Sequence, residues 1–141
     1  MVGHDILLIY EQDLKRAADI IRDLLIGSQA SCALLISRRD GSLIWQQGET
    51  GGLDTTSLAA LAAACFSATK EIARLIGEPE FSVLFHQGKR EHIHVSSIGE
   101  EALLMLLFDD RTTLGLVRVL AKDASNRLAQ ILSASSHPPS V

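Results

Sequence analysis

Apolar residues along the chain follow two kinds of pattern, and each pattern predicts one kind of element. In three segments they recur every three or four residues with polar residues between them, which is typical of amphipathic helices: residues 6–26, 54–76 and 114–132. Five shorter apolar runs are bounded by polar or glycine-containing turns and predict β-strands, at residues 31–39, 42–47, 81–87, 91–98 and 102–108.

The turns between these runs indicate how the strands pair. Asp40-Gly41 separates the first two runs, which predicts a hairpin with a type I′ turn, where both central residues have positive φ. The spacing of the last three runs predicts an antiparallel meander. Residues 81–87 begin this meander and are expected at a sheet edge. Residues 102–108 are apolar on both faces and suit a central strand covered by helices on both sides.

The order of these elements predicts an α+β fold. Helix, two strands, helix, three strands and helix give the order α-β-β-α-β-β-β-α, with a five-stranded antiparallel sheet between helical layers. No internal repeat or linker interrupts the pattern. We therefore expect one domain over residues 1–133, followed by a short flexible tail at residues 134–141.

Composition narrows the class of protein. The 141 residues are 47% apolar and 21% charged, a globular balance, and 13 basic against 17 acidic side chains give a net charge of −4. This charge argues against an electrostatic nucleic-acid binder. The longest apolar runs are about half the roughly 20 residues that a membrane-spanning helix needs. The first residues contain no basic region and reach Asp5 at once, so we do not expect them to be a secretory signal. Cys32 and Cys65 form no disulfide framework, so we expect a cytoplasmic protein with two buried thiols.

Motifs for catalysis or cofactor binding are absent from the sequence. The glycine-rich loop at residues 48–52 lacks the lysine of a phosphate-binding loop, and no zinc-protease or serine-hydrolase motif occurs. His86, His92 and His94 could together hold a metal, but surface histidines on the polar face of a strand are the favoured interpretation. We therefore expect no catalytic, cofactor-binding or metal-binding residues.

The middle helix, residues 54–76, is the most informative element because it has two dissimilar sides. At about 100° per residue, one side gathers the larger apolar residues and is expected to cover the sheet: Leu58, Leu61, Cys65, Phe66, Ala68, Thr69, Ile72, Leu75 and Ile76. The other side begins with small residues, which allow close approach of another helix, although an alanine-rich solvent face is the alternative. This side, together with the unpaired edge run at 81–87, favours a homodimer that serves as a docking surface.

Several strings resemble the Roadblock (dynein light chain) family, and within it the bacterial MglB group most closely. They are RRDGSLI at 38–44, DTTSLAALAA at 54–63, LIGEPEF at 75–81, FHQGKRE at 85–91 and FDDRTTLGLVR at 108–118. The resemblance implies a homodimer with one continuous sheet across the interface and the two middle helices side by side. It also implies that the dimer binds the GTP-loaded form of a small Ras-like GTPase, MglA, in bacterial polarity and gliding motility.

The same resemblance implies that such a dimer activates GTP hydrolysis by repositioning the catalytic groups of the GTPase, with no active site of its own. The alternative is a Roadblock scaffold that docks on a GTPase or motor complex without stimulating hydrolysis. Arg111, in the last string, is expected to form a structural ion pair rather than to enter a nucleotide site. The expected partner-binding residues are Ala60, Ala63, Ala64, Ser67, Lys70, Glu71 and Arg74.

Overall fold

The computed structural model describes residues 11–136 and contains the eight elements in the expected order. The helices are α1 (Glu11–Ser28), α2 (Thr55–Leu75) and α3 (Leu114–Ser136). The strands are β1 (Cys32–Ser37), β2 (Leu43–Gly48), β3 (Val83–Gln87), β4 (Glu91–Ile98) and β5 (Ala102–Asp109). Residues 6–10 of the first expected helix lie outside the described residues, and α3 continues through the first part of the expected tail.

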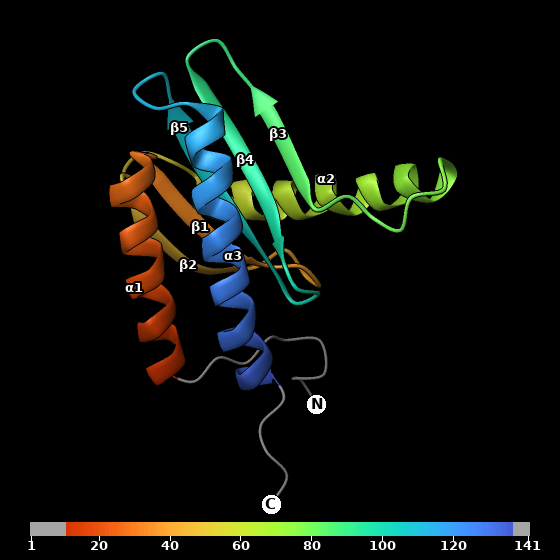
Figure 1. The fold of residues 1–141 in the computed structure, drawn as a ribbon, viewed down its shortest axis with the longest axis horizontal. Helices are drawn as coiled ribbons and strands as arrows, with labels where there is room; N and C mark the ends of the chain where they lie inside the picture. The colour runs from red at the N-terminus through yellow and green to blue at the C-terminus, as the bar shows by residue number, and fades with distance from the viewer. Residues whose placement is uncertain (1–10, 137–141) are drawn as a thin grey trace, which may run out of the picture.

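One five-stranded sheet organises the domain, with strand order β2-β1-β5-β4-β3 and antiparallel pairing throughout. The meander and the edge position of β3 are therefore confirmed, as is the central position of β5. Helices α1 and α3 lie side by side against one face of the sheet, and α2 crosses the other face (Figure 1). The predicted α+β class, with helical layers on both sides of the sheet, is confirmed.

Alternation along the strands divides the core into two layers. Leu35, Leu104 and Leu106 face α1 and α3 in the larger layer, whereas Leu34 and Met105 face α2 in the smaller one. All of β1 is buried because it lies inside the sheet and helices cover both of its faces.

The connection between β1 and β2 is a hairpin but not a type I′ turn, so that detail of the prediction was wrong. Gly41 has a φ of +71°, while Asp40 does not have positive φ. The Asp40 carboxylate instead accepts hydrogen bonds from the backbone N and the hydroxyl of Ser42, at 3.0 and 2.7 Å, which stabilise a longer turn. Gly41 also lies under α2, where an added Cβ would come within 3.2 Å of Ala60 Cα.

The C-terminal part of α2 projects beyond the edge strand β3 (Figure 1). In the described part of the chain, no helix is both long enough and apolar enough to cross a bilayer.

Candidate partner-docking surface

Helix α2 rests on the sheet through small residues. The Asp54 carboxylate caps its start by accepting a hydrogen bond from the backbone N of Ser57 at 3.1 Å, and Gly77 follows its end with a φ of +81°. Ala59 and Ala63 are buried against the sheet beside Phe66. The helix therefore lies close to the strands, with Phe66 as its one large, fully buried side chain.

The expected sheet-facing side of α2 was largely wrong. Leu61, Ile72, Leu75 and Ile76 are 52–76% exposed, and Cys65 is also exposed. Only Phe66 among the fully buried residues of α2 belongs to that expected set. The physical reason is that apolar residues cover a wide part of the helix surface, so the sequence pattern does not determine which side packs against the sheet. Here the alanine side packs against the sheet, and the larger apolar residues remain outside.

We call the exposed residues Leu61, Cys65, Ile72 and Ile76 the apolar flank of α2. On the sheet face that α2 covers, Leu84 and Ile93 are only half-buried, as is Leu107, the register partner of Ile93 on the same face. Exposed apolar helix residues above incompletely covered strands are unusual in a monomer and typical of a surface that another protein covers.

The opposite flank of α2 carries most of the expected partner-binding residues. Ala60, Ala64, Ser67, Lys70, Glu71 and Arg74 are all exposed, and we call them the docking stripe. Ala63 is a correction, because only 9% of its surface is exposed and it packs in the core below α2. Glu71 and Arg74 form an ion pair at 2.8 Å, so two of the charges on the stripe neutralise each other.

The edge strand β3 adds a second feature to this surface. It pairs with β4 on one side and with no other strand of the described chain. Its backbone N–H and C=O groups are therefore available on the outer edge for pairing with another strand.

The histidines do not form the surface pattern that the sequence indicated. His92 and His94 do lie on one face of β4, but that face is buried, with 7% and 1% of each residue exposed. His86 is exposed and lies on the opposite face, since its register partner is Ile93. The described residues contain no cluster of three or more His, Cys, Asp or Glu side chains that could hold a metal.

Burial explains the chemistry of the remaining candidates. Burial raises the pKa of the Cys32 thiol to about 11, with smaller contributions from Glu91 and Glu49, so this thiol is unreactive. Cys65 was expected to be buried and is exposed. Arg111 forms an ion pair with Asp109 at 3.0 Å and donates to the Ser31 hydroxyl at 3.0 Å, which matches the expected structural role.

Sequence reasoning missed a polar cavity of about 360 Å³ beside the docking stripe. Its lining comes from α2, from the turn after β1, from the segment before β3, from the turn between β4 and β5, and from the start of β5. Arg38 is its most buried charged residue, with a side chain that is 12% exposed. No short motif could have revealed this cavity, because distant segments build it. The RRDG string, which contains Arg38, predicted only the hairpin between the first two strands.

Comparison with known proteins agrees with this architecture. The Roadblock/LC7 domain model matches residues 19–108. Myxococcus xanthus MglB is 36% identical, with a TM-score of 0.80, over 84% of this chain and 96% of that one. An MglB with a tetrameric arrangement is 32% identical, with a TM-score of 0.88, over 94% of this chain and 99% of that one.

The gliding protein MglB from Thermus thermophilus is similar to the same degree, with 34% identity and a TM-score of 0.85 over 93% of this chain and 98% of that one. Curated protein sequences gave no match. The family match covers most of the domain, and the structural relatives share both its sequence and its topology. The chain therefore belongs to the Roadblock/LC7 domain family.

Proposed function

We propose that the chain is a homodimeric regulator that activates GTP hydrolysis by a small Ras-like GTPase of the MglA type. The dimer binds the GTP-loaded GTPase and repositions its catalytic groups, and it contributes no active site of its own. The observation that carries this proposal is that α2 exposes an apolar flank and a docking stripe at the same time. One surface is available for a second copy, and the other for the GTPase.

The apolar flank supports the homodimer. A second copy of α2, related by a two-fold axis, would cover Ile72 and Ile76 together with the half-buried sheet residue Leu84. The same axis would place two β3 edges side by side and pair their free backbone groups, joining the two sheets. Both features call for the same arrangement, so they support one interface.

The docking stripe supports binding of the GTPase. Ala60, Ala64 and Ser67 have small side chains, so a partner can approach the α2 backbone closely. A partner that orders the catalytic groups of a GTPase lowers the barrier without adding a residue, since phosphoryl transfer depends mainly on positioning and electrostatic stabilisation. In the cell, this activity would regulate polarity and gliding motility from the cytoplasm, with the protein concentrated at a pole.

The test is GTP turnover by an MglA-type GTPase with and without the chain. At a saturating concentration of the protein, we expect the rate of GTP hydrolysis to rise by at least about tenfold. Equal rates, with binding retained, would favour the scaffold alternative. No binding to the GTP-loaded form would refute both.

A variant locates the surface used. Ala64→Arg should abolish the stimulation while leaving the fold and native mass unchanged, because a long charged side chain blocks close approach to α2. Val119→Arg introduces the same residue at an exposed position of α3, on the other layer of the domain, and should remain fully active. If Ala64→Arg retains wild-type stimulation, the docking stripe is not the binding surface.

A further inference from the structure

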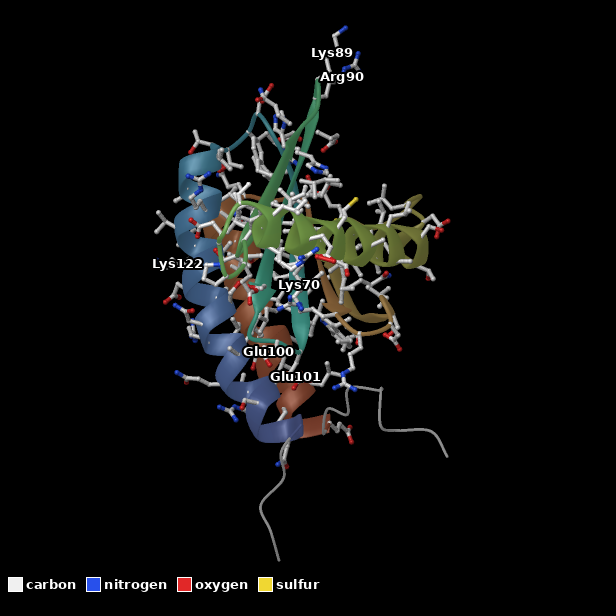
Figure 2. The ribbon with its side chains drawn as sticks, turned by 90° about the vertical axis from the view of Figure 1, so that its right-hand side faces the viewer. Lys70, Lys89, Arg90, Glu100, Glu101 and Lys122 are labelled. Carbon is white, nitrogen blue, oxygen red and sulfur yellow. The ribbon has the colours of Figure 1, made fainter. Side chains whose placement is uncertain are left out.

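The polar cavity lies on the docking side of α2. Its lining residues Ser67 and Lys70 belong to the docking stripe. Ser67 is two residues from Cys65 and therefore about 200° around the helix from the apolar flank. Figure 2 shows Lys70 on the side of α2 that faces the turn carrying Glu100 and Glu101. A second α2 seated on the apolar flank would leave this cavity open.

Arg38 is held in place at the base of the cavity by three contacts. Its Nη1 donates a hydrogen bond to the carbonyl oxygen of Gly99 at 2.9 Å, and its guanidinium lies 5.2 Å from the centre of the Phe66 ring. Its Nη2 is 3.8 Å from a carboxylate oxygen of Glu80. A guanidinium has five N–H donors, and among the described residues this side chain makes only the one hydrogen bond. Arg38 is therefore fixed in position while retaining donors for a ligand.

Lys70 supplies a second positive charge to the same cavity. Its ammonium makes no hydrogen bond or ion pair with the described residues. Within the lining, a carboxylate oxygen of Glu80 lies 3.8 Å from the Arg38 guanidinium, so the remaining Arg38 donors and the Lys70 ammonium are the cationic groups that can meet a ligand. The cavity is therefore locally complementary to an anionic group.

We infer that this cavity is a socket for one acidic side chain of the partner GTPase, whose carboxylate binds between the Arg38 guanidinium and the Lys70 ammonium. The inference rests on the proposed function. A singly charged carboxylate fits better than a phosphate group, because Glu80 and Glu100 line the same cavity and repel a higher charge. Continuity with the docking stripe makes the GTPase the occupant, since a protein lying on Ser67 also reaches the mouth of the cavity.

The socket is tested by the affinity of the dimer for the GTPase loaded with a non-hydrolysable GTP analogue, measured at several salt concentrations. Lys70→Gln should weaken binding by about tenfold and reduce the salt dependence, and Lys70→Glu should weaken it further, because a like charge then faces the incoming carboxylate. Lys70→Arg keeps the positive charge and should bind within about threefold of wild type. Lys122→Glu makes the same charge change as Lys70→Glu, at an exposed position of α3, and should leave the affinity unchanged.

Arg38→Lys provides an independent test, because lysine retains the charge but loses the planar fork. Native mass and circular dichroism must match wild type, and affinity should then fall by about tenfold. If wild type binds and Lys70→Glu binds equally well, the socket is refuted while the proposed function stands. If wild type does not bind the GTPase, the proposed function fails and the socket with it.

Discussion

Replacing Ile72 by aspartate should separate the proposed dimer into folded monomers. Ile72 lies on the apolar flank of α2 with 52% of its surface exposed, and in the proposed dimer the second α2 covers it. The substitution places a charge in that interface but removes little from the core of the subunit itself. The domain should therefore fold and lose only its partner.

The magnitude follows from the exposed area of the side chain. Complete burial of an isoleucine contributes about 1.5–3 kcal/mol, so covering its exposed half contributes about 1 kcal/mol per subunit and about 2 kcal/mol per dimer. At about 1.4 kcal/mol per factor of ten, Ile72→Ala should raise the dimer Kd by about 30-fold. Ile72→Asp adds the desolvation of two carboxylates, several kcal/mol each, and should prevent dimerisation at micromolar concentration.

Sedimentation velocity over a concentration series measures the effect directly. Wild type should sediment with twice the chain mass, Ile72→Ala should dissociate on dilution, and Ile72→Asp should sediment as a single chain with an unchanged circular dichroism spectrum. Val119→Asp is the matched control, because it places the same charge at an apolar position of α3 that is 65% exposed. A dimer that persists in Ile72→Asp with wild-type affinity would show that the apolar flank is not the interface.

Three further predictions concern the subunit itself. Phe66→Ala removes the large buried side chain of α2, which is 2% exposed, and should lower the free energy of unfolding by about 3–5 kcal/mol in urea titrations; a loss below about 1 kcal/mol would contradict the assigned core. Burial, and secondarily the charge of Arg118, lowers the pKa of His94, so the unfolded chain binds the proton more readily and stability should fall as pH drops below about 6.5. Thermal melts from pH 7.5 to 5.5 measure this, and His94→Leu should reduce the slope. Cys65 should react quickly with a thiol reagent in the Ile72→Asp monomer and slowly in the wild-type dimer, whereas Cys32 should react only after unfolding; equal rates for Cys65 in both proteins would argue against its burial in the interface.

Hydrophobic periodicity was sufficient to predict the fold but not the orientation of α2. The side of α2 with Ala59 and Phe66 and the side with Leu61 and Ile72 both have helical spacing, and apolar residues cover more than half of the circumference of the helix. Which side packs against its own sheet depends on how closely the backbone must approach the strands, and that distance is set by the tertiary structure. Ala63 was misplaced for this reason.

The histidines show a related limit. Alternation placed His92 and His94 on the same face of a strand, which the structure confirms. Whether that face meets water or a helix depends on the position of α3, which is distant in sequence. The cavity around Arg38 is a stronger case, because its lining residues, from Arg38 to Leu103, are up to 65 positions apart and have no local pattern in common.

The projection of α2 beyond β3 has a consequence for dosage. The outermost turns of that helix have no strand of their own subunit beneath them, so in the proposed arrangement the platform that receives the GTPase is completed only by association. By mass action, the amount of completed platform at low abundance grows with the square of the chain concentration. Doubling expression would then roughly quadruple the regulator, and local accumulation of the protein would by itself sharpen the boundary between active and inactive regions of the cell.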